Sequence, residues 1–462
     1  MTHMLSRSRA ANGAVRTLRR AWRSVALAGL SLLTGLQGAC AAEAYDIDAL
    51  VPERVVDARY FATHLHRLVA VAEPQARATP WPGGQIGALR LWDSSTRWAD
   101  LEPSRGAFAF DRLDAYVAEA QSQGASLLMV LGSPPRWAAA RPDEPGPYGP
   151  GSAAEPASMA DWERYVAALA QRYKGRIEAY ELWNEPYFSD LPADRGHPSA
   201  FFTGSVATMV ELARRTRAVL ARDDPQARLL TPGFVGGVER LDRFLNAGGG
   251  CCVDGVAYHF YADDEREFIK LHRAVRAVMA RHGISRLPLY NTESGFAADD
   301  AHGPHAGTSL DRTTAAALLA RSMVLGAFLG IDRFYQYAWD NGRSGMLQPG
   351  SLAPTASAAA FVAVRRWLLG TTLRACRLGS DGVVRCEGSR GANQLLIAWQ
   401  ASAARPGMIR LPASARPVSI DYAPALRRPI DAPAALRSGL VVGPDPVAVW
   451  WRSAPEARGV AP

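Results

Sequence analysis

Eight short apolar segments alternate with amphipathic segments between residues 59 and 339, and this alternation limits the possible folds more than any other feature. The apolar segments have the length of buried strands, whereas the segments between them repeat apolar residues about every 3.6 positions, as amphipathic helices do. The expected strands are RYFATHLH, GALRLWD, ASLLMVLG, IEAYELWN, RLLTP, VDGVAYHF, LPLYNTE and FYQYAW. Strands joined by helical crossovers are parallel and eight of them close into a barrel, so we predict an α/β fold with a (β/α)8 TIM barrel.

The pattern changes near Thr371, after which no long helical segment appears. Short strand-like segments such as QLLIAWQ and GLVVGPDPVAVWW follow, separated by Gly, Pro and Asp. This composition is typical of a small antiparallel β domain. We therefore predict an export signal at 1–41, the barrel at 42–370 and a β-sandwich-like accessory domain at 371–462.

The N-terminal segment has the composition of an export signal. Arg residues precede an apolar stretch at 25–36, which is shorter than the roughly 20 residues that cross a bilayer. Small residues at 39–41 suit cleavage, which would yield a periplasmic or secreted chain. Lipidation of Cys40 is the alternative and the only expected route to membrane association, but Gln37 stands where a lipobox prefers Leu, which favours plain cleavage.

The net charge of +8 comes mainly from this segment. Six of the 52 basic residues precede the first acidic residue, Glu43, and the remaining 46 face 44 acidic residues. No run of Lys and Arg lies beside aromatic residues, so we expect no nucleic-acid partner. We also expect a monomer without a cofactor.

Two pairs of cysteines suit an exported chain, in which disulfides form. Cys376 and Cys386 flank RLGSDGVVR, a predicted hairpin, and we predict a bridge between its strands. For the adjacent Cys251 and Cys252, a strained vicinal bridge and two buried thiols stay open as alternatives.

The fourth expected strand ends in LWNEP, where Asn184 and Glu185 stand side by side before a Pro. A turn or a helix cap is the ordinary explanation of such a sequence. In a TIM barrel, however, functional side chains lie at the C-terminal ends of strands, and Glu293 in LYNTESGF has that place on the seventh strand. Two Glu residues across a barrel mouth are the groups that cleave glycosidic bonds, because one protonates the leaving oxygen and the other attacks or activates water.

The motifs LWNEP and YNTESGF resemble those of the retaining glycoside hydrolases of clan A. The flanking segments LRLWDSSTRWADLEPSRGAFAFDRLDAYV and VLGSPPRWA resemble glycoside hydrolase family 39, particularly its biofilm exopolysaccharide branch of the PslG type. The resemblance covers roughly residues 60–370. It implies that Glu185 is the acid/base, Glu293 the nucleophile and Asn184 the donor to the sugar 2-hydroxyl, with carboxyl groups about 5 to 5.5 Å apart.

Charged and polar residues near other strand ends are candidate partners of this pair. Arg90 would stabilise the carboxylate of Glu293 and keep it ionised, with a mere ion pair at the mouth as the alternative. His259 and Tyr261 point the same way on the sixth strand, so we expect Tyr261 to hydrogen-bond the nucleophile. For His259 a purely structural role stays open.

Histidine and tryptophan side chains are candidate sugar-binding groups. His64 and His66 share a face of the first strand, and we expect one of them to reach the sugar; no third ligand accompanies them, so we expect no metal. Aromatic rings pack on the C–H faces of sugars, and among the tryptophans near strand ends we favour Trp339, then Trp137, then Trp92, with core packing as the alternative.

These features favour an endo-acting hydrolase of a bacterial exopolysaccharide, with a polysaccharide or oligosaccharide as substrate. Two alternatives stay open: an exo-acting glycosidase of the xylosidase type, and a protein that binds polysaccharide on the same barrel without cleaving it. The Pro- and Gly-rich segment 141–157 would either close off the cleft or line an extended groove.

We predict that the mature chain begins near Ala42, because a short apolar segment followed by small residues is removed on export. Mass spectrometry of the exported protein's N-terminus measures this directly. An acylated Cys40 would place the protein on a membrane surface instead, and an intact Met1 would contradict export.

Overall fold

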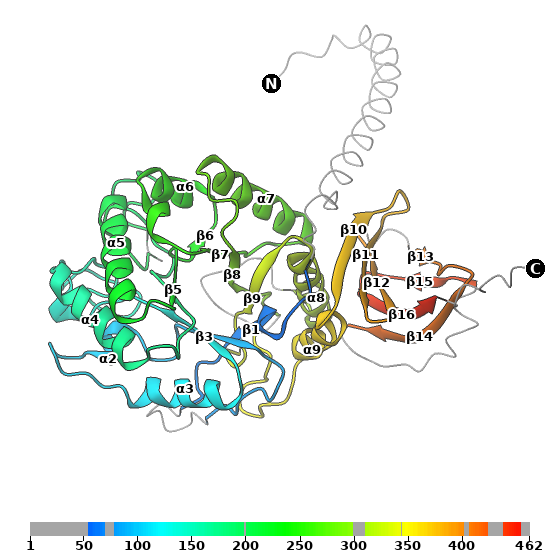
Figure 1. The fold of residues 1–462 in the computed structure, drawn as a ribbon, viewed down its shortest axis with the longest axis horizontal. Helices are drawn as coiled ribbons and strands as arrows, with labels where there is room; N and C mark the ends of the chain where they lie inside the picture. Colours follow the sequence, from blue (N-terminus) through cyan, green and yellow to red (C-terminus); the bar gives the residue numbers. More distant parts are fainter. Residues whose placement is uncertain are drawn as a thin grey trace, which may run out of the picture.

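The computed structural model describes residues 54–69, 78–197, 200–298, 310–342, 344–401, 406–423 and 438–453. The predicted export signal, including Cys40, lies outside them. A barrel and a smaller β domain stand side by side in the described part of the chain (Figure 1). In that part, no helix has both the length and the apolar character needed to cross a membrane.

The barrel wall consists of parallel strands: β1 (Phe61–His64), β2 (Ala88–Leu91), β3 (Ser126–Val130), β4 (Ala179–Glu181), β5 (Arg228–Leu230), β6 (Phe234–Val235), β7 (Val256–His259), β8 (Leu289–Ser294) and β9 (Ile331–Gln336). Their order is β5-β4-β3-β2-β1-β9-β8-β7-β6. β5 and β6 are two halves of one strand position, separated only by residues 231–233. A parallel bridge between Leu230 and Gly255 closes the ring. The predicted eight-position barrel is therefore confirmed.

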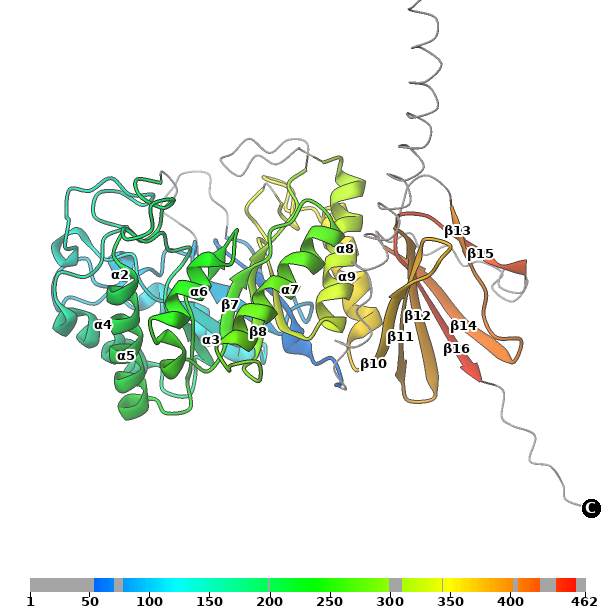
Figure 2. The same cartoon turned by 90° about the horizontal axis from the view of Figure 1, so that it is seen from above.

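Helices cover the outside of this wall (Figure 2). They are α2 (Trp98–Leu101), α3 (Asp111–Ser122), α4 (Met159–Arg172), α5 (Val206–Asp223), α6 (Glu239–Asn246), α7 (Glu265–Arg281), α8 (Arg312–Phe328) and α9 (Ala356–Leu368), with 3-10 turns η2 (Ala58–Tyr60), η3 (Arg136–Ala138) and η4 (Gly249–Cys252). Side-chain oxygens that accept backbone N–H groups begin α4, α5, α7 and α8, at Ser158, Ser205, Asp264 and Asp311. Such caps satisfy N–H groups that the first helical turn leaves without a partner.

The β domain is antiparallel. Its larger sheet has the order β10 (Thr372–Leu378), β11 (Val383–Arg390), β12 (Asn393–Gln400), β16 (Val447–Ser453) and β14 (Ala415–Tyr422), and β13 (Gly407–Ile409) pairs with β15 (Leu440–Val442). Cys376 and Cys386 face each other in the β10–β11 hairpin and are bridged, as predicted. Cys251 and Cys252 are bridged as well, so of the two alternatives the structure contains the vicinal disulfide.

Helix α8 is buried between the two parts of the molecule (Figure 1). All its residues from Ala315 to Phe328 are buried, which explains why the helix is apolar on every side. The buried side chain of Arg321 binds Glu265 of α7 at 2.9 Å and donates from Nε to the carbonyl oxygen of Pro444 at 2.9 Å. This contact joins the barrel to the β domain.

Side chains inside the barrel form an apolar floor below a polar layer. The floor takes one residue from each strand position, and each is at most 2% exposed: Ala62, Ala88, Leu128, Ala179, Leu230, Ala257, Tyr290 and Tyr335. Because side chains alternate along a strand, the next inward side chain comes two residues later. On β1, β2, β4 and β7 that side chain is charged or titratable and fully buried: His64, Arg90, Glu181 and His259. These four residues form the base of the candidate site.

Candidate active site

The guanidinium of Arg90 connects several strands at the centre of the polar layer. Its Nε and Nη2 donate to the two oxygens of Glu181, at 2.9 and 2.7 Å. Nη1 donates to Glu293 Oε2 at 2.8 Å, and Nη2 also donates to Asn184 Oδ1 at 2.7 Å. Burial lowers the pKa of Arg90, but the carboxylates of Glu181 and Glu293 outweigh burial and raise it, so the group stays a cation.

Both carboxylate oxygens of Glu293 accept hydrogen bonds. Oε2 accepts from Arg90, and Oε1 accepts from the hydroxyl of Tyr261 at 2.8 Å, as expected for both partners. Burial raises the pKa of Glu293, and the positive charges of His259 and Arg90 oppose this rise without cancelling it. The expected cation is therefore present and lowers the pKa of this carboxyl, although burial has the larger effect.

Glu185 follows β4 in a left-handed backbone conformation, with φ of 38°. Its backbone N–H donates to the carbonyl of Gly233 at 2.9 Å, and its neighbour Asn184 forms a parallel bridge with the same glycine. A left-handed residue other than Gly is strained and persists only where its surroundings hold it, which occurs most often at functional sites. The connection between β5 and β6 supplies that support here.

His259 lies between the two carboxyl groups that the sequence singled out. Its Nδ1 is 2.7 Å from Glu185 Oε1. Burial lowers the pKa of His259, but the charge of Glu293 and the hydrogen bonds of Glu181 and Glu185 outweigh burial and raise it to about 9. The imidazole is thus protonated at neutral pH and donates Nδ1–H to Glu185.

Glu185, His259 and Glu293 each place one potential metal-ligand atom within 4.8 Å of the others. Among the described residues this is the one such group of three or more. A His must be neutral to bind a metal, whereas His259 is held protonated by the carboxylates around it. The cluster therefore suits paired acid and base chemistry better than it suits a cation.

The two histidines of β1 differ in their surroundings. Their rings lie 5.0 and 5.3 Å from the ring of Tyr337, for His64 and His66 respectively. His64 is fully buried, and its Nε2 hydrogen-bonds the carbonyl of Thr292 at 3.0 Å. Burial lowers the pKa of His64 well below its usual value. Of the two, only His66, which is half-buried, is open to a ligand.

The three tryptophans pack mainly against the protein. Trp339 is 7% exposed and lies edge-on to Phe361 of α9. Trp92 is 2% exposed, and the half-buried Trp137 donates from Nε1 to the carbonyl of Glu102 at 3.1 Å. Trp92 and Trp339 are thus largely covered by the protein, Trp339 to the same extent as Glu293.

Sequence reasoning missed Glu181 and Asp93. Asp93, just after β2, accepts from the hydroxyl of Tyr337 at 2.6 Å and from the hydroxyl of Tyr148 in the 141–157 segment. Glu181 had a signal in the sequence, because it comes two residues after Ala179 on a buried strand and therefore points inward. A carboxylate in that position requires a buried cation, which Arg90 provides.

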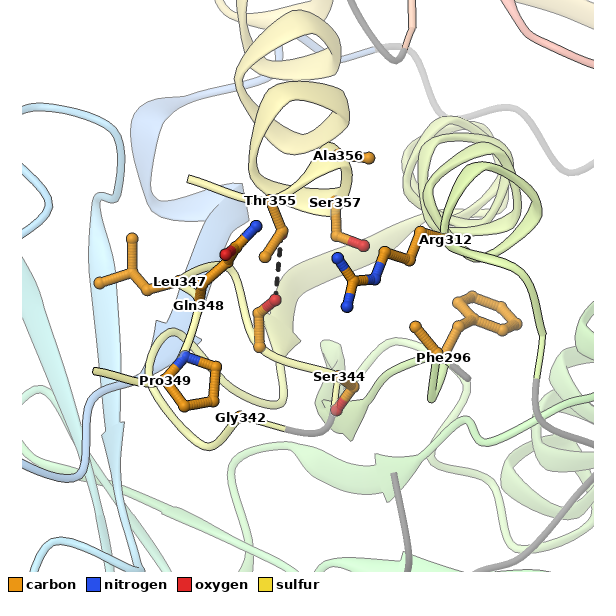
Figure 3. A pocket seen from close by; sticks show the side chains of 12 residues that line it. Phe296, Arg312, Gly342, Ser344, Leu347, Gln348, Pro349, Thr355, Ala356 and Ser357 are labelled. Carbon is orange, nitrogen blue, oxygen red and sulfur yellow. Dashed lines mark hydrogen bonds between the residues drawn. The ribbon is translucent and has the colours of Figure 1, made fainter. Parts of the chain in front are cut away.

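A separate cavity of about 190 Å³ lies at the same end of the barrel, between the segments after β8 and β9 and the N-terminal ends of α8 and α9 (Figure 3). The side chains that point toward it include Arg312, Ser357 and Phe296. Gln336 Nε2 donates to the carbonyl of Ser344 at 3.1 Å, which joins the cavity wall to the end of β9. Among the described residues that line it, none is acidic.

Solved structures of similar fold include several sugar-cleaving enzymes. A family 39 glycoside hydrolase from Bacteroides cellulosilyticus WH2 matches with a TM-score of 0.59 and 16% identity over 80% of this chain and 76% of that one. A glucosidase from Croceicoccus marinus matches with 0.57 and 17% over 80% of each chain. A family 30 subfamily 8 xylanase from Clostridium acetobutylicum matches with 0.58 and 12% over 87% of this chain and 98% of that one.

No model of a protein family matches the chain. The low identities mean that these comparisons establish the fold. The fold that the motifs implied is confirmed, and one of the matched structures is a family 39 glycoside hydrolase.

We predict that His259 stabilises the protein in acid and neutral solution but not in alkaline solution. Its pKa of about 9 exceeds the ordinary value of 6.5, so its contribution is fully present below pH 6.5 and is lost as the pH rises through 9. The loss amounts to about 3 kcal/mol. Urea unfolding of the wild type and of His259→Gln at several pH values should show the gap between their free energies of unfolding narrowing over this range. A gap that is constant with pH would contradict a protonated His259.

Proposed function

We propose that this protein is a retaining glycoside hydrolase, specifically an endo-acting hydrolase of a bacterial exopolysaccharide. The observation that carries the proposal is the pair Glu185 and Glu293, which place oxygens within 4.8 Å of each other at the barrel mouth. Carboxyl groups about 5 Å apart suit direct attack on the sugar, whereas an inverting enzyme needs about 6.5 to 9.5 Å to admit a water between them. The fold neighbours that are glycoside hydrolases support the same class.

Glu293 is the nucleophile in this mechanism. Arg90 and Tyr261 each donate one hydrogen bond to it, which orients the carboxylate for attack on the anomeric carbon. The same guanidinium orients Asn184. Its Oδ1 accepts a hydrogen bond from Arg90, so its Nδ2–H group points away from Arg90. That amide is the proposed donor to the sugar 2-hydroxyl.

Glu185 is the acid and then the base. It protonates the glycosidic oxygen as the covalent intermediate forms, and it later removes a proton from the water that releases the sugar. The protonated His259 at 2.7 Å stabilises the negative charge that Glu185 gains when it gives up its proton.

The charges of the site suit a pair of carboxyl groups that shares one proton. Arg90 and His259 are positive, so full ionisation of Glu181, Glu185 and Glu293 would leave one excess negative charge in a buried cluster. One proton bound by the catalytic pair neutralises the cluster, and a general acid needs that proton. The free site is thereby prepared for the first step.

A polymeric substrate, action in the periplasm or outside the cell, a monomeric state and independence of cofactors and metals belong to the same proposal. The exopolysaccharide branch of family 39, which the motifs resemble, and the export-like N-terminus support the substrate and the location. The cavity beside the mouth offers hydroxyl, amide and aromatic groups of the kind that bind sugars (Figure 3).

An exo-acting glycosidase is the second candidate, and one contact favours it. Asp93 accepts hydrogen bonds from the hydroxyls of Tyr148 and Tyr337. Tyr148 lies in the segment after β3 and Tyr337 follows β9, so the two tyrosines approach from opposite sides of β1. This contact holds the 141–157 segment over part of the mouth and would close one end of a groove. Sizing of the first products separates the candidates, because an endo-acting enzyme releases oligosaccharides and an exo-acting enzyme releases one sugar unit.

We predict opposite behaviour for variants of the two carboxylates. Glu293→Gln should lower turnover by at least about 10⁴-fold on every substrate, because no covalent intermediate can form. Glu185→Ala should retain the first step on a substrate with a good leaving group, and azide should restore its turnover with a glycosyl azide of retained configuration. Kinetics and NMR of the product measure both effects.

Glu178→Gln is the matched control, since this half-buried Glu precedes β4 at the opposite end of the barrel and should leave turnover unchanged. Azide rescue of the Glu293 variant with an inverted product, and none for the Glu185 variant, would reverse the assignment. Wild-type protein that binds polysaccharide without releasing reducing ends would favour the binding-protein alternative.

A further inference from the structure

Glu181 is a buried carboxylate for which the mechanism above has no step. It lies on β4, four residues before Glu185, and none of its surface is exposed. A buried ion pair gains little net stability, because removing two charges from water costs several kcal/mol per ion. The pair that Glu181 forms with Arg90 therefore calls for an explanation other than stability.

The way Glu181 binds Arg90 restricts how Arg90 binds Glu293. Glu181 occupies the edge of the guanidinium formed by Nε and Nη2, at 2.9 and 2.7 Å. Only Nη1 then reaches Glu293, through one hydrogen bond of 2.8 Å to Oε2. A guanidinium without such a partner is free to turn its outer edge to a carboxylate and bind both oxygens at once.

We propose that Glu181 is a positioning residue for the nucleophile: it holds one edge of Arg90, limits Arg90 to a single hydrogen bond with Glu293 and offsets part of its positive charge. The proposal rests on the function proposed above, in which Glu293 attacks the sugar. Tyr261 already binds Oε1, so a guanidinium bound at both oxygens would add a charged donor to Oε1 and engage more of the charge of the carboxylate, which makes it a weaker nucleophile. Glu181 thus keeps Glu293 reactive.

The backbone around Glu181 is shaped to admit this carboxylate. A Cβ atom on Gly233 would lie 2.2 Å from Glu181 Oε1 and 2.5 Å from His259 Nε2, so only glycine leaves room for the two side chains. The pKa of Glu181 is lowered, because Arg90 and His259 outweigh the opposing effect of burial. Its negative charge is therefore present at working pH.

A substitution at position 181 keeps the other charged and titratable groups around Glu293, although loss of the Glu181 charge also lowers the pKa of His259. These groups are Arg90 on β2 and Asp93 after it, His259 on β7 and Tyr261 after it, Glu185 after β4, Tyr337 after β9, and Tyr148 in the 141–157 segment. Loss of the Glu181 charge leaves the Arg90 cation less offset. The carboxylate of Glu293 should then ionise at lower pH.

Two substitutions separate the effect of the charge of Glu181 from the effect of its side-chain length. In Glu181→Gln the shape is kept and the charge is lost, so we expect the pKa of Glu293 to fall by about one unit and kcat on an activated aryl glycoside to fall at least about 10-fold. In Glu181→Asp the charge is kept, but the carboxylate is retracted by one methylene. We expect the pKa of Glu293 to stay close to the wild-type value while kcat falls.

The readouts are a ¹³C NMR titration of the Glu293 carboxyl in the free protein, assigned with Glu293→Gln, and the acid limb of kcat/KM. The acid limb should move to lower pH in Glu181→Gln only, and Glu178→Gln should change neither readout. The NMR titration needs no turnover, so it tests the charge effect even if the glycosidase proposal fails.

Three results would overturn the proposal: an unchanged Glu293 titration in Glu181→Gln, equal titration shifts in both variants, or a wild-type kcat in Glu181→Asp. Circular dichroism shows whether each variant is folded. If Glu181→Gln does not fold, kcat of Glu181→Asp decides the matter, because a merely structural carboxylate would leave the kcat of a folded variant unchanged.

Discussion

The buried guanidinium of Arg90 is the interaction on which the rest of the site depends. None of its surface is exposed, and it bonds carboxylates from β4 and β8 as well as the amide of Asn184. A buried cation that loses a partner costs about 3 to 5 kcal/mol, so these strands must keep their relative register. The apolar floor beneath excludes water from below, which strengthens each charge interaction in the layer above it.

The same layer explains how a stable barrel carries a reactive site. Residues that stabilise the barrel and residues that act on a ligand alternate along the same strands, so Ala179 belongs to the floor, Glu181 to the charged layer and Glu185 to the mouth. Glu185 is one of four described residues other than Gly that have a left-handed backbone, and Gly233 holds it in place. The strained backbone of Glu185 is therefore held by the connection between β5 and β6 rather than by β4.

Much of the fold and the two central carboxylates could be predicted because their signals are local. Strand ends follow from short apolar runs, and Glu185 and Glu293 stand at two of those ends. The role of Glu181 could not be read in this way, because its partner Arg90 is 91 residues away in the chain. What covers Trp339 could not be predicted, because a strand end says nothing about the elements that pack over it; Phe361 of α9 packs against its ring.

The path of the 141–157 segment also depends on distant contacts. Its Tyr148 is held by Asp93, 55 residues earlier, and Arg141 binds Glu144, Glu155 and Thr203. The composition of the segment indicated a long irregular connection. It did not indicate over which side of the mouth the segment folds. Long-range side-chain pairs of this kind decide how much of the mouth stays open to a polymer.

In the proposed mechanism, Glu293 forms a covalent bond to the sugar. Incubation with a 2-deoxy-2-fluoro glycoside of the sugar that product analysis identifies, followed by peptide mass spectrometry, tests this most directly, because the fluorine slows release of the intermediate. We expect one added glycosyl group, on the peptide that contains Glu293. A label on Glu185, or turnover of the natural substrate with inversion and no label, would contradict it.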